Sequence, residues 1–343
     1  MENEVIDKEY YIDKKDLRPI GKGTFGEVYK CHKKNSNDVF CVKKIIVKNM
    51  KGNNSYLKDE IKILETIKEE KVPNAIQLYK HLWKDEGKPS EVVYLIMDLC
   101  EGGSLDELIK KHEILMETDI YYLLEPVMVC LAELHRLKII HRDLKAENIL
   151  LLKKWNEDEP KNAKVRLIDF GVSAQDKNMN LISTVGTPMT MAPEIIMNKK
   201  YNESVDVYSF GIILHQMLFG SPPFNVDTYD KWFKSKISLL NLPKSRFLTV
   251  ECFDLIQRCL MIEPKKRITF EQMKKHPFFE RKGRGHPFYE VFDGTKDVTF
   301  INMRQDPLNC LEALEEKNKV KANNPFYKSN RALLKKVMDS ELD

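Results

Sequence analysis

The ten-residue string HRDLKAENIL, at residues 141–150, constrains the fold of this chain more than any other feature. It places a carboxylate (Asp143), an ammonium (Lys145) and an amide (Asn148) close together, and a second acid, Asp169, follows 26 residues after the first. Because the two acids are far apart in sequence, they can meet only if the chain folds back between them. The apolar strings NILLL and KVRLI flank a polar linker there and predict the two strands of a β-hairpin.

A glycine-rich string, GKGTFG, begins at Gly21 and fits the pattern G-x-G-x-x-G, which on its own is compatible with two kinds of nucleotide site. A dinucleotide fold needs a helix directly after the loop and an acid about 20 residues later. Here EVYKC continues as a strand, and two cations, Lys43 and Lys44, stand at that distance. The loop is therefore expected to join two strands and to cover phosphates with its backbone N–H groups, which approach closely at Gly21, Gly23 and Gly26. For the loop taken alone, a turn with a purely structural role remains the alternative.

The spacing of apolar residues changes character near residue 100. Before that point Val28 to Val47 alternates as strands do, Val92 to Met97 forms a short apolar run, and only Tyr56 to Ile67 has helical spacing. After a break at EGGS, apolar stripes predict helices around 123–134, 205–219 and 250–260. This pattern favours an α+β chain, with a small β-rich lobe, a larger helical lobe and a cleft between them.

Composition and charge exclude several classes of protein. The 343 residues carry a formal net charge of +4, which is too small to argue for nucleic acid, and apolar runs reach only about six residues where a membrane helix needs about 20. The seven cysteines have no metal-ligand spacing, and the N-terminal MENEVIDKEY lacks the apolar stretch of a secretory signal. We expect a reduced, cytoplasmic protein, with the nucleus as an alternative, that has no membrane or nucleic-acid partner.

Taken together, these motifs resemble those of eukaryotic protein kinases of the serine/threonine type. The resemblance covers roughly residues 15–280 and implies the two-lobed kinase fold, with an N-lobe at 15–98 and a C-lobe at 99–280. Residues 1–14 are then an N-terminal extension, and residues 281–343 are a C-terminal extension of unknown role. The strings IDFGVSA and VGTPxxMAPE are closest to kinases of MAP-kinase cascades and their Ste-like relatives.

The resemblance implies transfer of the γ-phosphate of ATP to Ser or Thr hydroxyls of protein substrates. Asp143 would act as the catalytic base, and Lys145 would offset charge on the γ-phosphate. Lys43, in the string FCVK, would neutralise the α- and β-phosphates and would be held by Glu60 on the predicted helix. The metal ligands for Mg²⁺, with Mn²⁺ as a substitute, would be Asn148 and Asp169.

The adenine of ATP would lie against the segment that links the two lobes. By position in YLIMDLCEGGSL, Met97 would lie at the back of the site, and the backbone of Asp98 and Cys100 would hydrogen-bond the base. Ser104 would reach the ribose. The apolar walls implied by the resemblance are Ile20, Val28, Cys41 and Leu150.

The string VGTPMTMAPE, at residues 185–194, would end the activation segment, with Thr187 beside the catalytic aspartate. Phosphorylation of Ser183 or Thr184 by an upstream kinase would give Arg142 an anion to bind and would order the segment. Structural roles are implied for three further residues. The first two would form a buried ion pair, and the third would support the catalytic loop. These residues are Glu194, Arg267 and Asp206.

Two other classes of protein share part of this pattern. A pseudokinase or scaffold would bind nucleotide without catalysis, but such a protein has usually lost one of the four central polar residues, and all four are present here. A small-molecule kinase of related fold lacks a long activation segment ending in APE, which this chain has at residues 192–194.

Overall fold

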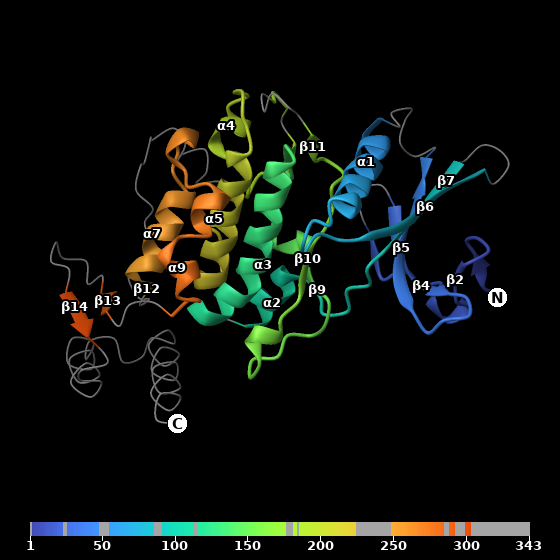
Figure 1. The fold of residues 1–343 in the computed structure, drawn as a ribbon, viewed down its shortest axis with the longest axis horizontal. Helices are drawn as coiled ribbons and strands as arrows, with labels where there is room; N and C mark the ends of the chain where they lie inside the picture. Colours follow the sequence, from blue (N-terminus) through green and yellow to red (C-terminus); the bar gives the residue numbers. More distant parts are fainter. Residues whose placement is uncertain are drawn as a thin grey trace.

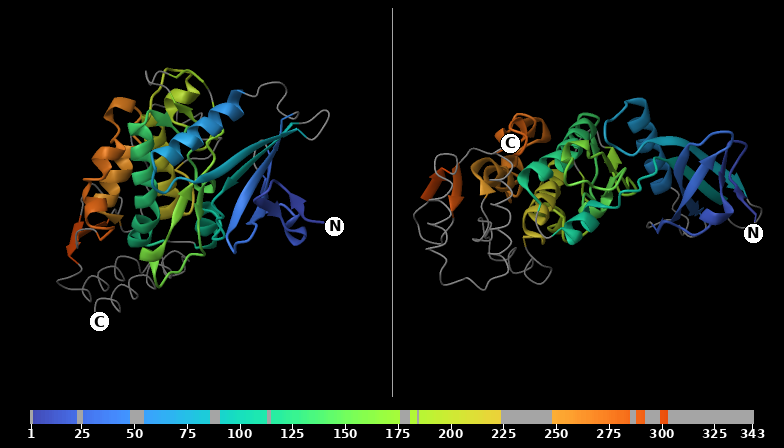
Figure 2. Two further views of the ribbon diagram at one scale, coloured as in Figure 1. Left: turned by 45° about the vertical axis from the view of Figure 1, so that its right-hand side comes forward. Right: turned by 90° about the horizontal axis from the view of Figure 1, so that it is seen from below.

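The computed structural model describes residues 2–22, 26–47, 55–85, 91–112, 115–175, 181–183, 185–223, 248–284, 288–291 and 299–302. Two of the predicted site residues, Gly23 and Thr184, lie outside the described residues, as does most of the C-terminal extension. The strands of the first hundred residues and the helices that follow form two parts at opposite ends of the molecule (Figure 1), and Figure 2 shows the same separation from two further directions.

A seven-stranded antiparallel sheet forms the N-terminal part. Its strands run in the order β1-β2-β4-β5-β7-β6, and the short strand β3 also pairs with β4. The strands are β1 (Glu4–Val5), β2 (Tyr10–Ile12), β3 (Gly21–Lys22), β4 (Gly26–Lys33), β5 (Val39–Ile46), β6 (Leu78–Asp85) and β7 (Glu91–Met97). One helix, α1 (Ser55–Glu69), interrupts the strands, as the helical spacing there predicts. The predicted fold class is confirmed.

The two faces of this sheet pack against different partners because side chains alternate along each strand. On one face, Ile45 and Leu95 join a core cluster with buried residues of α1, such as Leu64. On the other face, Val42 and Tyr94 join a second, separate cluster. The alternation directs Lys43 toward the α1 face and its neighbour Lys44 toward the opposite face.

The first twelve residues of the chain complete the second cluster. Ile6, Tyr10 and Ile12 are buried in it against the sheet. The carboxylate of Glu4 lies 2.7 Å from the ammonium of Lys44. The N-terminal extension is therefore an integral part of the sheet, although its two strands are too short for the sequence pattern to reveal them.

The C-terminal part is mainly helical. Its helices are α2 (Leu105–Lys111), α3 (Glu117–Arg136), α4 (Pro193–Ile196), α5 (Ser204–Phe219), α7 (Val250–Cys259), α8 (Phe270–Met273) and α9 (Pro277–Glu280). Three of them, α3, α5 and α7, coincide with the predicted apolar stripes. Helix α5 is buried on almost every side, which suits the centre of a helical bundle.

Short strands and single 3₁₀ turns connect these helices. The strands are β8 (Ile139–Ile140), β9 (Ile149–Leu151), β10 (Val165–Leu167), β11 (Ala174–Gln175), β12 (Leu248–Thr249), β13 (Phe288–Val291) and β14 (Thr299–Asn302), and the 3₁₀ turns include η3 (Ala146–Asn148). Strands β9 and β10 pair antiparallel, with Leu151 opposite Val165, so the predicted hairpin between the two acids is confirmed.

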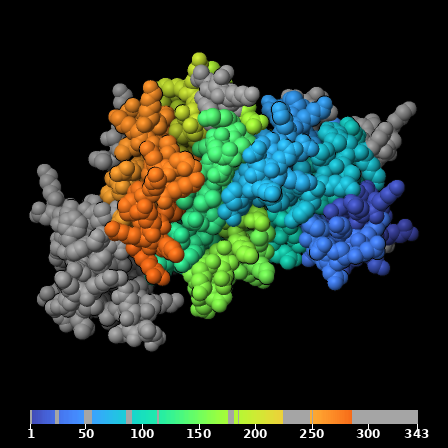
Figure 3. All heavy atoms as spheres, viewed as in Figure 1, coloured from blue at the N-terminus to red at the C-terminus, as the bar shows by residue number. Residues whose placement is uncertain are grey.

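The two parts are joined by more than the connecting segment. One core cluster runs from the α1 face of the sheet through α3 into the helical part, and the surfaces of α1 and the following helices meet in the space-filling view (Figure 3). The backbone N–H of Ile76, just after α1, also donates to the carbonyl of Leu167 in β10 at 2.9 Å. None of the described helices is long and apolar enough to cross a membrane.

The second cluster generates a test of the role of the N-terminal strands. Ile12 is fully buried there, so Ile12→Ala is expected to lower the free energy of unfolding by about 2–4 kcal/mol. Val5 lies on the neighbouring strand and is 51% exposed, so Val5→Ala is the matched control, with an expected change within about 0.5 kcal/mol. Urea denaturation measures both values. A loss for Ile12→Ala as small as that for Val5→Ala would show that the N-terminal strands do not contribute as packed elements.

Candidate active site

Strand β5 and helix α1 bring Lys43 and Glu60 into a buried ion pair. The ammonium of Lys43 lies 2.6 Å from a carboxylate oxygen of Glu60, and the two residues are only 8% and 3% exposed. Burial alone would lower the pKa of Lys43, but the charges of Glu60 and Asp169 outweigh it and raise that pKa above its usual value. The lysine therefore remains a cation at neutral pH, and it interacts electrostatically with Asp169 as well as with Glu60.

The carboxylate of Asp143 is surrounded by the other polar groups of its loop. The ammonium of Lys145 lies 2.9 Å from Oδ2, and the hydroxyl of Thr187 donates to Oδ1 at 2.7 Å. Lys145 also donates to the Thr187 hydroxyl oxygen at 2.9 Å. The end of the activation segment is therefore bound to the catalytic loop, and the three predicted neighbours do come together.

Asn148 and Asp169 offer the oxygen atoms that a magnesium ion prefers. The Nδ2 amide of Asn148 donates to the backbone carbonyl of Asp143 at 2.8 Å, so its Oδ1 is left as an acceptor on the other side of the amide. Asp169 follows strand β10 and has a positive φ of 63°, a conformation that aspartate tolerates better than most residues. Within the described part of the chain, no group of three or more His, Cys, Asp or Glu residues could hold a metal.

This small donor set fits Mg²⁺, which usually binds one or two protein side chains together with substrate phosphates and water. Phe170, the residue after Asp169, is almost completely buried and packs edge-on against the ring of His141, with 5.2 Å between the ring centroids. That contact holds the backbone next to Asp169 in place.

One buried carboxylate of helix α5 binds the backbone of the catalytic loop. Asp206 accepts the backbone N–H groups of His141 at 2.9 Å and Arg142 at 3.0 Å, and the Nε2 of His135 lies 2.9 Å from it. Burial alone would raise the pKa of Asp206, but the contacts with His135 and His141 hold it below its usual range. The carboxylate is therefore ionised at neutral pH and fixes the backbone just before Asp143.

The side chain of Arg142 reaches the activation segment. It donates to the carbonyl of Val172 at 2.5 Å and to the hydroxyl of Ser183 at 2.9 Å. The buried Tyr201 joins this contact, because its hydroxyl lies 2.9 Å from the Ser183 hydroxyl. Sequence reasoning missed both Tyr201 and His135, since neither lies in a motif and only the folded chain brings them to the site.

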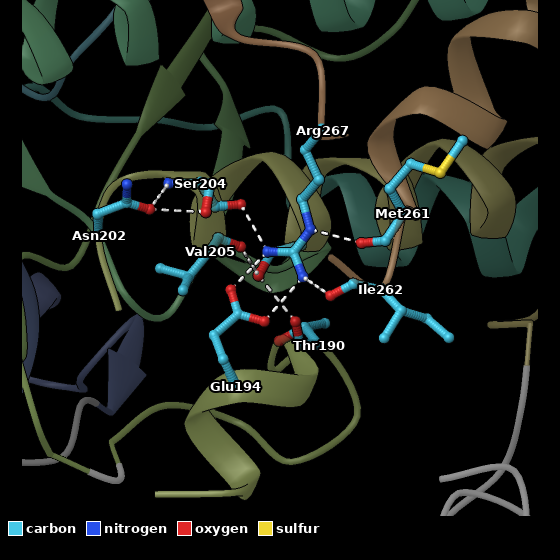
Figure 4. Close-up of polar contacts among 9 residues, drawn as sticks. Thr190, Glu194, Asn202, Ser204, Val205, Met261, Ile262 and Arg267 are labelled. Carbon is cyan, nitrogen blue, oxygen red and sulfur yellow. Dashed lines mark hydrogen bonds and ion pairs between the residues drawn. The ribbon is translucent and has the colours of Figure 1, made fainter. Parts of the chain in front are cut away.

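The predicted pair between Glu194 and Arg267 is a bidentate ion pair with distances of 2.5 and 2.7 Å (Figure 4). The remaining guanidinium donors reach the backbone carbonyls of Met261, Ser204 and Ile262. All five N–H groups of Arg267 therefore have acceptors, and the guanidinium also lies 4.9 Å from the centroid of the Tyr208 ring. This arrangement holds the end of the activation segment against the bundle.

The described residues predicted to surround the nucleotide lie on β3, β4, β5, β7, β9 and the segment after β7, except Ile20, which directly precedes β3. Cys41 is buried opposite Met97 on the adjacent strand, and its thiol donates to the backbone carbonyl of Asp98 at 3.2 Å. Ile20 is 57% exposed. Ser104 caps helix α2 by accepting from the backbone of Glu107, so its hydroxyl has a structural partner before any ribose arrives.

Two of the three motif glycines of the glycine-rich loop are described, Gly21 and Gly26, and they differ in how much space a side chain would have. At Gly26 a Cβ atom would lie 2.3 Å from the carbonyl of Lys44, so no larger residue fits without moving the backbone of β5. At Gly21 the nearest atom would be 3.8 Å away, an ordinary contact. Close packing between strands therefore requires glycine at position 26.

Comparisons with known proteins agree with this fold. A family model described as "Protein kinase domain" matches residues 14–279, so the chain belongs to the protein kinase family. It is 35% identical over 283 residues to calcium-dependent protein kinase 5 of Plasmodium berghei (strain Anka), covering 81% of this chain and 47% of that protein. It is 33% identical over 270 residues to the human serine/threonine-protein kinase ULK3, covering 76% of this chain and 53% of that protein. The chain spans about half the length of these curated relatives.

The Arg267 arrangement predicts a large loss of stability when its charge is removed. Arg267→Gln leaves Glu194 buried without its cation, so the free energy of unfolding is expected to fall by about 3–5 kcal/mol. Arg258 offers a matched control, because it pairs with Asp254 on the same helix and is 55% exposed. Arg258→Gln is expected to cost no more than about 1 kcal/mol. Thermal and urea denaturation measure the two variants, and similar losses would contradict the structural role of Arg267.

Proposed function

We propose that this chain is a serine/threonine protein kinase that transfers the γ-phosphate of ATP to Ser or Thr hydroxyls of protein substrates. The proposal is carried by one observation, the closed set of contacts around Asp143, which joins Lys145, Asn148 and Thr187. The ion pair of Lys43 with Glu60 supports it from the other lobe. The membership of the protein kinase family and the serine/threonine kinases among the relatives support the same reaction class.

In the proposed reaction, the substrate hydroxyl oxygen forms a bond to the γ-phosphorus while the bond from that phosphorus to the bridging oxygen of ADP breaks. Asp143 orients the hydroxyl and accepts its proton. Lys145, which contacts Asp143, would stabilise the charge on the phosphoryl oxygens as they transfer, and Lys43 would bind the α- and β-phosphates. Such positioning supplies most of the rate in phosphoryl transfer.

Asn148 and Asp169 are the residues that would hold Mg²⁺ or Mn²⁺. The bound ion would supply positive charge next to the β- and γ-phosphates. The backbone of Asp98 and Cys100 is proposed to receive the adenine. Ile20, Val28, Cys41, Met97 and Leu150 would contact the base, and Ser104 would reach the ribose.

The domain organisation that we propose has a kinase domain at residues 15–280, divided at residue 98 into N-lobe and C-lobe. Residues 1–14 and 281–343 are its extensions. The strings IDFGVSA and VGTPxxMAPE support a place among the MAP-kinase-cascade (Ste-like) kinases, and substrate profiling on a peptide array tests that subfamily. The partners would be protein substrates and an upstream activating kinase in the cytoplasm.

The first test of the proposed reaction is the loss of Asp143. The wild-type chain is expected to transfer phosphate from Mg–ATP to a generic protein substrate, and Asp143→Asn is expected to lower kcat at least about a hundredfold because the proton acceptor is lost. Asp59→Asn, at an exposed position of α1, serves as the matched control and should retain the wild-type rate. A wild-type chain that binds ATP and transfers no phosphate would favour the nucleotide-binding scaffold instead.

We also propose that phosphorylation of Ser183 or Thr184 raises the activity. The Ser183 hydroxyl already lies 2.9 Å from the guanidinium of Arg142, so a phosphate there would meet a cation directly. In the unmodified chain the hydroxyl of Tyr201 contacts both the Ser183 hydroxyl and the guanidinium of Arg142. A doubly charged phosphate would bind the guanidinium of Arg142 more strongly than the neutral hydroxyl does. It would thereby hold the activation segment against the residue before Asp143.

The regulatory proposal predicts that Ser183→Ala combined with Thr184→Ala abolishes activation by an upstream kinase. The phosphorylated wild type is expected to be at least about tenfold more active than this double variant, on the scale of one or two charge-assisted hydrogen bonds. Ser36→Ala, in the exposed turn between β4 and β5, controls for the loss of a hydroxyl elsewhere. Equal activity of the double variant and the phosphorylated parent, with phosphate incorporation followed by mass spectrometry, would refute the proposal.

A further inference from the structure

The carboxylate of Asp98 accepts hydrogen bonds from three residues in two separate regions of the chain. Asp98 is the first residue after strand β7, where the chain leaves the sheet for the helical part. Its Oδ2 accepts from the Nε of Arg166 at 2.7 Å and from the backbone N–H of Gln77 at 3.3 Å, and its Oδ1 accepts from the hydroxyl of Tyr79 at 2.8 Å. The side chain is only 11% exposed, so these donors replace much of the water that an ionised carboxylate requires.

The donors come from both parts of the molecule. Tyr79 lies on β6 and Gln77 just before it, in the sheet part, whereas Arg166 lies on β10, in the hairpin that leads to Asp169. The backbone of Asp98 is held as well, because its N–H donates to the carbonyl of Gln77 at 3.3 Å. One side chain therefore ties the connecting segment to the sheet and to the helical part at the same point.

The tyrosine that reaches Asp98 is itself held by an aromatic series. The ring of Tyr79 lies edge-on to Phe40 of β5 with centroids 4.7 Å apart, and Phe40 lies edge-on to Tyr10 of β2 at 5.7 Å. Partial burial and the hydrogen bond to Asp98 raise the pKa of Tyr79 to about 12. The hydroxyl therefore stays protonated and donates at neutral pH, and its position depends on packing that extends to the N-terminal strands.

We propose that Tyr79 and Arg166 are positioning residues that latch the Asp98 carboxylate and thereby fix the backbone of residues 98–100 for the adenine of ATP. The inference rests on the proposed function, because that function assigns the adenine to this segment. The latch acts on nucleotide affinity and leaves the chemical step alone, since Asp143 is held by different contacts, from Thr187 and Asn148.

The latch predicts a specific kinetic signature for Tyr79→Phe and Arg166→Gln. Each variant loses one hydrogen bond to the charged carboxylate of Asp98, whereas the hydrogen bond from the Asp98 backbone N–H to Gln77 remains. The KM and the Kd for ATP are therefore expected to rise about fivefold to tenfold. The kcat is expected to stay within about twofold of wild type. Arg166→Lys keeps a cation near Asp98 and is expected to recover at least half of the lost affinity.

The control is Arg136→Gln, which removes an arginine that is 57% exposed and paired with Glu133 at the end of α3. It is expected to change neither KM nor Kd. Melting temperatures of all variants separate loss of affinity from loss of fold, and Tyr79→Phe keeps the ring that packs on Phe40, so it tests the latch even where Arg166→Gln unfolds.

Direct binding of ATP, measured by calorimetry, keeps this proposal distinct from the proposed function. If wild type binds ATP but transfers no phosphate, the kinase assignment falls and the latch is judged on Kd alone. If the folded Tyr79 and Arg166 variants bind ATP as tightly as wild type, or lose kcat with unchanged KM, the latch is wrong while the kinase assignment stands. A folded wild type that binds no ATP overturns both.

Discussion

The ion pair between Lys43 and Glu60 is the contact on which the geometry of the site depends. Removing two charges from water costs on the order of several kcal/mol for each ion, and this cost is offset only while the two groups remain in contact. Because Lys43 belongs to β5 and Glu60 to α1, a distance of 2.6 Å fixes the helix against the sheet. The charge of Asp169 also acts on this lysine and helps to raise its pKa, so one cation interacts with acids from both parts of the molecule.

On the side of the site formed by the helical part, two buried carboxylates hold segments of the chain in place. Asp206 binds the N–H groups before Asp143, and Glu194 binds Arg267 behind the activation segment. Neither acid is expected to touch the nucleotide. They hold the backbone of the catalytic loop and the end of the activation segment, which carry Asp143, Lys145 and Thr187.

Local patterns predicted much of this arrangement. The helical spacing around Leu64 predicted α1, the alternation from Val28 to Val47 predicted the strands β4 and β5, and the strings around residues 149 and 167 predicted the β9–β10 hairpin. The contacts of Asp98 with Arg166, and of Ser183 with Tyr201, could not be predicted in this way. They join residues 68 and 18 positions apart that share no periodic pattern, and only the packed fold brings them together.

The N-terminal strands show the same limit, because two- and three-residue strands leave too short an alternation to read. Their presence has a practical consequence for where the polypeptide is cut. A shortened chain starting at residue 14, where the family match begins, would uncover the apolar face of Val42, Tyr94 and Ile96 and the edge of β4. Exposed apolar surface beside an unpaired strand edge favours self-association, so the trimmed protein would aggregate or dimerise more readily than the longer chain.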